Sequence, residues 1–279
     1  MTIDTADALI SAMGNKSSRL IIDKASIANA AVGQFHSLWR ATGQPGQAAI
    51  PAAVAVPNNA TVGAIRFAQQ TAPATSYLGI LEALCSNAGT TLEIHDRLCE
   101  MGGLNGTLTT AQTVNMDLSA LLATSNLDAR KGDANYSDVQ WWLEWFADTG
   151  ATASTVTVAV TYNDGSTGGL TAQAIAATRR ASFMLPLNAL IPAAAAGKFI
   201  CAVTSVTLAT STGTAGSFGV VATRYRGAIY QPIANARFTA DWSSLGLPEI
   251  ENSACLFGVQ VANATSTGAV RATGKIVHG

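Results

Sequence analysis

The fold is decided by the stretch Val139-Gln-Trp-Trp-Leu-Glu-Trp-Phe146 and by Thr155-Val-Thr-Val-Ala-Val-Thr-Tyr162, which follows it closely. In the first stretch every odd-numbered residue is apolar, and Trp142 and Phe146 make the opposite face largely apolar as well. Because side chains alternate between the two faces of a strand, both stretches predict β-strands. The first strand is apolar on both faces, which is typical of a sandwich interior or of a subunit interface.

The second stretch runs directly into Asn163-Asp-Gly-Ser166, where Asp-Gly tolerates the positive φ of a tight hairpin turn. Short strands separated by glycine-rich turns are typical of antiparallel sandwiches and jelly rolls. The sequence therefore predicts a mainly β fold of antiparallel β-sandwich or jelly-roll-like domains. Further strands are expected at Thr90–Leu98, Thr107–Leu118, Ser182–Leu187, Phe199–Ala209, Ser217–Tyr225, Cys255–Val261 and Ala269–Val277.

The N-terminal segment predicts a short amphipathic helix that begins after Asp4 or Thr5 and ends before Gly14. Its apolar residues at helical spacing are Leu9, Ile10 and Met13. Long loops are expected between the strands. Three further expectations are an extended loop at Thr42–Pro57, a strand-like region at Thr61–Leu84 interrupted by Pro73, and a turn at Met101–Gly106.

The polar run Asp128–Asp138 is the candidate boundary between domains. It predicts four parts: an N-terminal helix or arm at residues 1–18, a first β-rich domain at 19–132, a β-sandwich domain at 133–230, and a C-terminal β-rich extension at 231–279.

The composition is typical of a chain whose surface is covered by other copies of itself. Of its 279 residues 48% are apolar and 12% are charged, against roughly 25% charged in ordinary domains. A surface with few charges is poorly solvated unless neighbours cover it, so we expect a homo-oligomer or an assembly component. The net charge of −1 argues against a nucleic-acid partner, which requires clustered basic residues. The apolar runs are too short for a membrane-spanning helix, so no membrane is expected.

No motif in the sequence predicts catalysis or a cofactor. His36, His95 and His278 do not stand at metal-ligand spacing, and the four cysteines include no CxxC pair. No GxSxG, Walker or GxGxxG motif occurs. We therefore expect no catalytic residue, no metal and no cofactor. Whether Cys85 and Cys99 form a disulfide stays open, because a cytosolic product keeps its thiols reduced whereas a particle outside the cell does not.

Glu144 lies among Trp141, Trp142 and Trp145, a composition that also occurs where aromatic rings stack on sugars. Core packing on an alternating strand explains the same residues. Carbohydrate contact at this cluster is therefore kept as an alternative interpretation, and hydrolysis would further require two carboxyl groups across a cleft.

Three stretches resemble virion structural proteins of tailed bacteriophages, a group encoded among head and tail genes. They are Thr91–Leu98 with Gly102–Leu104 and Thr109–Thr113, Trp142–Gly150 with Val156–Tyr162, and Val203–Leu208 with Thr212–Gly219. The resemblance spans about residues 18–230 and carries strand and turn patterns, with no reactive residues.

The resemblance implies a non-enzymatic structural protein of the virion, made in the cytoplasm of the bacterial host. No long central helix of a major capsid protein can be drawn, so a capsid-associated protein is expected, as a decoration or minor head subunit. Its partners would be copies of itself and the major capsid protein. A tail or baseplate component is the alternative, followed by a glycan-binding module for host attachment. The residues expected at interfaces are Trp141, Trp142, Trp145 and Phe146, with Leu9, Ile10 and Met13 of the N-terminal helix.

Overall fold

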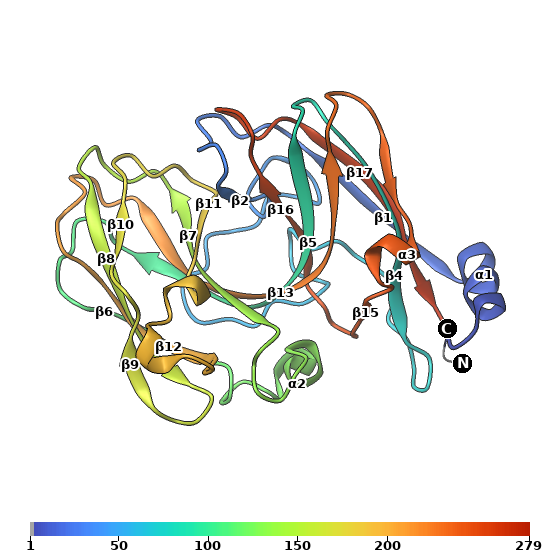
Figure 1. Cartoon of the computed structure of the whole chain (residues 1–279), viewed down its shortest axis with the longest axis horizontal. Coiled ribbons are helices and arrows are strands. Elements are labelled where there is room, and N and C mark those ends of the chain that lie inside the picture. The colour runs from blue at the N-terminus through green and yellow to red at the C-terminus, as the bar shows by residue number, and fades with distance from the viewer. Residues whose placement is uncertain (1–2) are drawn as a thin grey trace. The chain divides into compact units, whose positions relative to one another are not determined.

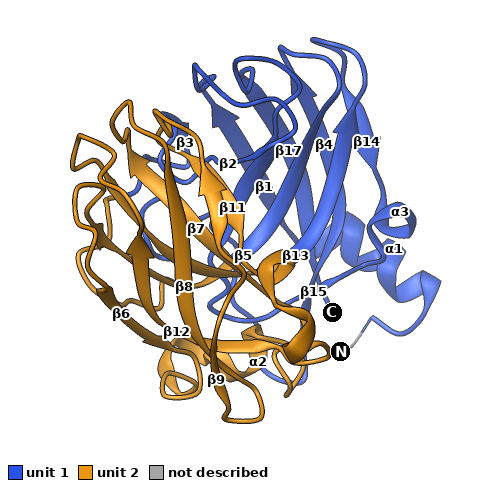
Figure 2. Cartoon of the chain, turned by 60° about the vertical axis from the view of Figure 1, so that its left-hand side comes forward, with its two compact units in different colours: residues 1–48, 58–96, 225–279 blue, residues 49–57, 97–224 orange. Residues whose placement is uncertain are grey.

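The computed structural model describes residues 3–279, and antiparallel strands dominate it (Figure 1). They form three antiparallel sheets. The predicted mainly β class with a short N-terminal helix is confirmed. Met1 and Thr2, which begin the predicted N-terminal arm, lie outside the described residues. The chain divides into two compact units: unit 1 comprises residues 1–48, 58–96 and 225–279, and unit 2 comprises residues 49–57 and 97–224 (Figure 2).

Unit 1 is organised around one large sheet. Its elements are α1 (Ala6–Asn15), β1 (Ser17–Lys24), β2 (Phe35–Ser37), β3 (Gly43–Gln44), β4 (Ser76–Cys85), β14 (Phe238–Ala240), α3 (Trp242–Leu245), β15 (Glu249–Ile250), β16 (Leu256–Val261) and β17 (Val270–His278). The strands of the large sheet follow the order β14-β4-β17-β1-β3, and β15 also pairs with β4. β16 pairs with β2 on one side and with the first half of β5 (Thr90–Leu104) on the other.

Unit 2 is a sandwich of two strand layers. Its elements are the second half of β5, β6 (Gln112–Asp117), α2 (Leu127–Arg130), β7 (Val139–Ala147), β8 (Ser154–Tyr162), β9 (Thr167–Gly169), β10 (Gln173–Ile175), β11 (Phe183–Pro186), β12 (Ile200–Leu208) and the first half of β13 (Ser217–Gln231), with short 3-10 turns at Thr124–Asn126, Asn188–Leu190 and Ala193–Ala195. One layer follows the order β10-β8-β12-β6, with β9 paired to β8. In the other layer β7 pairs with β11 and with β13.

The alternation of β7 and β8 explains how the two layers of unit 2 share one core. Inward side chains of both layers belong to a single buried cluster, which includes Trp141, Leu143 and Trp145 of β7, Val156, Val158 and Val160 of β8, Val203 and Val206 of β12, and Phe218 and Val220 of β13. Alternate residues of β8 are exposed or half-buried threonines and alanine. A period of 2 therefore places one apolar row inward, as the sequence predicted.

The predicted hairpin after β8 is present. Gly165 has φ +80°, and β9 returns antiparallel to β8. The Asp164 carboxylate accepts hydrogen bonds from the backbone N–H and the hydroxyl of Ser166, at 3.0 and 2.6 Å. Lys198 Nζ lies 2.8 Å from the same carboxylate. These contacts hold the pKa of Asp164 well below its ordinary value.

The predicted N-terminal helix is α1. The Thr5 hydroxyl accepts a hydrogen bond from the N–H of Ala8 at 3.1 Å, which makes Thr5 the N-cap. The helix passes through Gly14 and ends at Asn15, slightly later than predicted. Leu9 and Ala12 bury their side chains with Val277 of β17, so the helix is anchored on the large sheet of its own unit.

Two local predictions were wrong. The turn expected at Met101–Gly106 starts only after Leu104, because β5 continues through the two glycines Gly102 and Gly103. The region Thr61–Leu84 is a strand only from Ser76 onward, and its first part is loop. Glycine is common in turns, but it also occurs within strands where a neighbouring backbone comes too close for a Cβ atom.

The structural division also differs from the segments predicted at 19–132, 133–230 and 231–279. β17, near the C-terminus, pairs along its whole length with β1 and with β4, so the C-terminal residues belong to the same unit as the N-terminal ones. The polar run Asp128–Asp138, predicted as a boundary, lies within unit 2. Pairing between strands about 250 residues apart in sequence leaves no local signal.

Candidate interaction surface

The aromatic residues predicted as an interface are core residues of the chain itself. Trp141, Trp142, Trp145 and Phe146 of β7 are each at most 3% exposed. Trp145 stacks on Phe218 with ring centroids 5.6 Å apart and tilts against Phe183 at 5.3 Å. Their prediction as partner contacts is therefore corrected, since no side chain of this set reaches the surface of the chain.

Two of the three indole groups of β7 also find their polar partners internally. Trp141 Nε1 donates to the carbonyl of Ile200 at 2.8 Å, and Trp142 Nε1 donates to the Thr223 hydroxyl at 2.8 Å. A buried tryptophan with a satisfied N–H is typical of a core. Sequence alternation could not separate an apolar strand covered by the chain's own layers from one covered by a second subunit.

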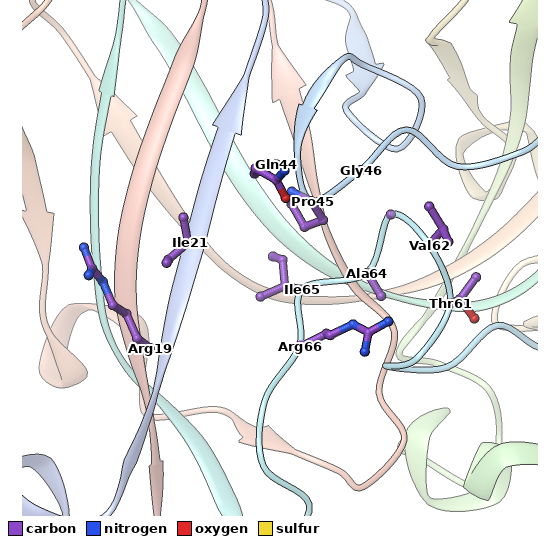
Figure 3. A pocket seen from close by; sticks show the side chains of 11 residues that line it. Arg19, Ile21, Gln44, Pro45, Gly46, Thr61, Val62, Ala64, Ile65 and Arg66 are labelled. Atoms are coloured by element: carbon purple, nitrogen blue, oxygen red, sulfur yellow. The ribbon is translucent and has the colours of Figure 1, made fainter.

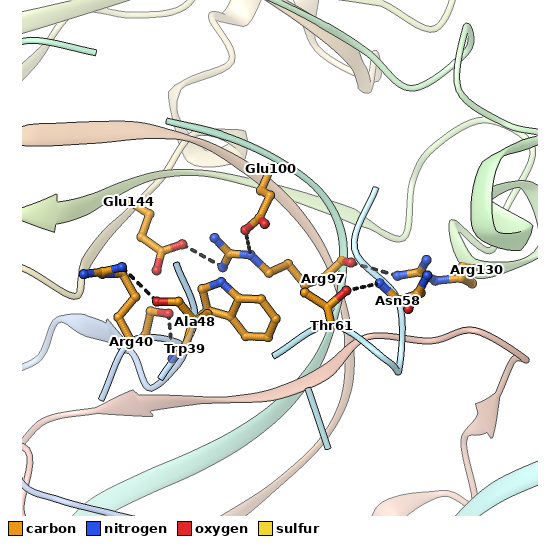
Figure 4. A network of polar contacts seen from close by, with 10 residues as sticks. Trp39, Arg40, Ala48, Asn58, Thr61, Arg97, Glu100, Arg130 and Glu144 are labelled. Atoms are coloured by element: carbon orange, nitrogen blue, oxygen red, sulfur yellow. Dashed lines mark hydrogen bonds and ion pairs between the residues drawn. The ribbon is translucent and has the colours of Figure 1, made fainter. Parts of the chain in front are cut away.

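Glu144 belongs to a buried ion cluster, so it is not available to a sugar (Figure 4). Arg97 Nη1 lies 2.7 Å from the Glu144 carboxylate, and Arg97 Nε donates to Glu100 at 2.5 Å. Glu144 is 1% exposed. Burial by itself lowers the pKa of Arg97, but the charges of Glu144 and Glu100 outweigh burial and raise that pKa above its ordinary value.

A second arginine anchors this cluster to the loops of unit 2. Arg130 is fully buried on α2 and donates to the carbonyls of Arg97 at 2.8 Å and Pro57 at 2.9 Å. Such contacts position backbone segments and leave no free group for a substrate. The sugar-binding interpretation of the Trp141–Glu144 region therefore loses the exposed carboxylate and aromatic rings that it requires.

The N-terminal helix presents one of its predicted contact residues to the outside. Leu9 is buried on β17 and Met13 is half-buried against the same cluster. Ile10 is 68% exposed. Of the three residues, the structure leaves Ile10 in a position to contact another molecule.

The titratable side chains that the sequence analysis weighed are held in structural contacts. His95 Nε2 lies 2.9 Å from the Glu93 carboxylate in unit 1. The Ser18 and Ser76 hydroxyls lie 2.8 and 2.9 Å from the two ring nitrogens of His278, whose pKa is lowered by burial. All four cysteines are buried free thiols, so Cys85 and Cys99 are unpaired with each other, and burial raises the pKa of Cys99 to about 12.

Within residues 3–279, no group of three or more His, Cys, Asp or Glu side chains is placed to hold a metal ion. Among the helices of the same residues, none is long and apolar enough to cross a membrane.

A hollow of unit 1 lies beside β1 (Figure 3). We call it the β1 edge groove. It has a volume of about 420 Å³. Its lining residues are Arg19 and Ile21 of β1, Gln44 of β3, Pro45 and Gly46 directly after β3, and the loop from Thr61 to Arg66.

The β1 edge groove combines exposed apolar side chains with cations. Ile21 is 46% and Val62 is 59% exposed. Arg19 and Arg66 are exposed at its rim, and none of its lining residues is acidic. Sequence reasoning missed this site. The available signal was that Ile21 lies out of phase with Leu20 and Ile22, which makes the outward face of β1 apolar too.

Comparison with known proteins identifies no family for this chain. No protein-family model matches it, and no curated protein matches its sequence. Among solved structures, it has a weak similarity to the VP2 capsid protein of infectious bursal disease virus. The subviral particle of VP2 aligns over 94% of this chain and 79% of that chain, with 10% identity and a TM-score of 0.17. The T13 particle of that virus aligns over 94% and 77%, with 8% identity and a TM-score of 0.15.

Proposed function

We propose that this chain is a non-enzymatic structural subunit of a tailed-bacteriophage particle, bound to the head as a decoration or minor head protein. It would be made in the cytoplasm of the bacterial host and become part of the virion. Its partners would be copies of itself and the major capsid protein, without a cofactor or nucleic acid.

One observation carries this proposal. The three stretches that resemble phage virion proteins coincide with β5, with β7 and β8, and with β12 and β13. In unit 2 these strands form the paired layers around the shared core. The resemblance therefore lies in the packed framework, which supports a relationship in fold to that group.

The mechanism would be passive. A subunit that covers apolar surface at many repeated contacts stabilises a shell by roughly 25 cal/mol per Å² of apolar area, before the costs of association. The low share of charged residues, 12%, suits a surface that neighbours cover. Exposed apolar side chains of unit 1, such as Ile10, Ile21 and Val62, are candidates for these contacts.

Particles propagated from the genome that encodes this chain provide the test. Quantitative mass spectrometry of purified virions is expected to find the chain in hundreds of copies, and electron microscopy is expected to locate it on the head. Copy numbers of three, six or a small multiple would instead favour a tail or baseplate component. Absence of the chain from mature virions would refute a structural role.

Glycan binding is tested separately on the isolated chain. With the aromatic rings around Glu144 buried, we expect a glycan array to show no binding. A specific glycan signal that survives substitution of Trp142 would point to host attachment through another surface.

A further inference from the structure

We propose that the β1 edge groove binds an extended acidic segment of another protein, which adds a strand to the free edge of β1. The partner is thus defined by its chemistry: an extended chain with acidic and apolar residues in alternation. This proposal stands on unit 1 alone and is independent of the virion function proposed above.

The pairing register shows that the edge of β1 is open. The N–H of His278 donates to the carbonyl of Lys16 at 2.8 Å, so even-numbered residues of β1 exchange hydrogen bonds with β17. The N–H and C=O groups of Arg19 and Ile21 therefore point away from β17. On that side β3 pairs only with Asp23 and Lys24.

No hydrogen bond within residues 3–279 uses these four backbone groups. The β1–β17 register turns them away from β17, and neither Arg19 nor Ile21 makes a backbone hydrogen bond outside the strand ladders. The neighbouring loop is tied to β1 at one point, where the N–H of Ala68 donates to the Ser18 hydroxyl at 2.9 Å. An edge with unused donors and acceptors is a template for an added strand.

The groove beside this edge has the shape that an added strand needs. β1 forms one wall, and the loop from Thr61 to Arg66 forms the other, with Pro45 at one end (Figure 3). That loop is itself fixed, because the N–H of Ile65 donates to the carbonyl of Leu256 at 2.8 Å. At about 3.3 Å per residue, the edge from Ser17 to Ile21 spans about 13 Å. Three to five residues of an extended chain match that length.

The charges around the groove select an acidic occupant. Arg19 and Arg66 stand on its two walls, and neither has a carboxylate partner among the described residues. By contrast, Arg237 and Arg271 of the same unit pair with Glu82 at 3.1 Å and Asp23 at 3.4 Å. A carboxylate placed beside Arg19 would gain a charge-assisted contact.

Ile21 and Val62 provide the apolar part of the lining. Arg19 and Ile21 lie on the exposed face of β1, whereas Leu20, Ile22 and the groove-lining Ile65 belong to the buried cluster on the other face. Because successive side chains of a strand point to opposite faces, a chain with alternating residues can place its acidic side chains on the face of Arg19 and its apolar side chains on the face of Ile65.

A second copy of β1 is a poorer occupant. Two copies of β1 would pair antiparallel about a two-fold axis, and Asp23 cannot take part because it already pairs with Gln44 of β3. The registers that remain bring Arg19 directly opposite, or diagonal to, Arg19 of the second copy. Like charges at these cross-strand positions are destabilising. The geometry therefore favours a different chain over an edge-to-edge dimer.

The test uses the full chain and a fluorescein-labelled synthetic peptide of alternating valine and glutamate, measured by fluorescence anisotropy at low salt. Three control peptides separate the contribution of charge from that of the backbone hydrogen bonds. They carry lysine in place of glutamate, a scrambled order that breaks the alternation, and N-methylation of the alternate amides that face β1. We expect each control to bind at least about tenfold more weakly, and the acidic peptide to weaken as salt is raised.

Variants of the chain locate the site. Arg66→Glu is expected to weaken binding at least about tenfold, whereas the matched control Arg237→Ala should leave it unchanged. Ile21→Pro removes an N–H that points to the open edge and is also expected to abolish binding; its circular dichroism spectrum reports whether it folds. Arg66→Glu keeps the test decisive if Ile21→Pro does not fold.

Amide hydrogen exchange supplies a readout that general electrostatic attraction would not move. The amides of Arg19 and Ile21 are expected to exchange fast in the free chain and to become protected with the acidic peptide. Protection confined to these amides supports strand addition. Equal binding of the acidic and lysine peptides, no effect of Arg66→Glu, or no binding up to about 1 mM peptide would each overturn it.

Discussion

Replacing Arg97 by methionine tests the buried ion cluster of unit 2 most directly. Methionine keeps the length of the aliphatic stem but removes the cation that lies between Glu100 and Glu144, at 2.5 and 2.7 Å. The Arg97 side chain is fully buried and Glu144 is 1% exposed. The variant therefore leaves two carboxylates without the charge that compensates them.

The expected cost follows from that burial. Removing one partner of a buried ion pair costs about 3–5 kcal/mol of unfolding free energy, and the loss here falls at the upper end because two carboxylates share one cation. Glu144→Gln is expected to cost less, since its amide still accepts from Arg97, which also keeps Glu100. The double variant Arg97→Met, Glu144→Met should be more stable than Arg97→Met alone, because it removes one of the uncompensated charges.

Urea unfolding followed by tryptophan fluorescence and by circular dichroism measures these differences. The matched control is Arg180→Met, whose ion pair with Asp148 is 38% and 45% exposed at its two side chains and should cost less than about 1 kcal/mol. A carboxylate becomes neutral by taking a proton, so the deficit of Arg97→Met should shrink as the pH is lowered from 7 to 5. A deficit no larger than that of Arg180→Met at pH 7 would refute the burial of the cluster.

Four further predictions address other residues. Trp242 is 45% exposed while the other four tryptophans are at most 3% exposed, so Trp242→Phe should remove most of the iodide-quenchable fluorescence of the native chain; strong residual quenching would contradict the burial of β7. Burial lowers the pKa of His278 below the unfolded value of about 6.5. The neutral imidazole therefore contributes its full stability above that pH, and this contribution is lost as the pH falls from about 6.5 through the folded pKa. Between pH 7 and 5 the thermal stability of His278→Gln should fall less than that of the unchanged chain, and identical pH profiles of the two chains would contradict this. With all four thiols buried and the pKa of Cys99 at about 12, Ellman's reagent at pH 8 should label no cysteine in the native chain and all four in guanidinium chloride, and prompt native labelling would contradict this. A Cβ added at Gly219 would lie 1.8 Å from the carbonyl oxygen of Met101, so Gly219→Ala should lower the unfolding free energy by more than about 3 kcal/mol, whereas Gly169→Ala, with nothing within 4 Å, should change it by less than about 1 kcal/mol.

The parts of the fold that the sequence predicted are those that local chemistry determines. The alternation from Val139 to Phe146 and the Asp164-Gly165 turn act over a few residues, and β7 and the β8–β9 hairpin appear where they were expected. Thr5 satisfies an N–H of the first helical turn within three residues of itself, and of the two predicted N-caps, Asp4 and Thr5, it is the one that caps α1. Such signals need no knowledge of distant segments.

The division into units and the candidate site depend on distant segments and were out of reach. β1 is an open edge only because β17, about 250 residues later, pairs on one side and the two-residue β3 ends early on the other. The wall of the β1 edge groove comes from a loop that the sequence suggested as strand. Its position is fixed by a hydrogen bond from Ile65 to Leu256.

The wrong interface prediction at β7 has a physical cause that also favours the β1 edge groove. Large aromatic side chains gain most from burial, so a chain with few charged residues places them in its own core first, as Trp141 and Trp145 show. Tyr225, Tyr230 and Trp242 are exposed outside the β1 edge groove, whose own lining is smaller: Ile21, Val62 and two arginines without carboxylate partners. Contacts at this groove would then depend on backbone hydrogen bonds and charge more than on aromatic anchors. An open strand edge offers both in one place, since its N–H and C=O groups set the direction of the partner while Arg19 and Arg66 select its charge.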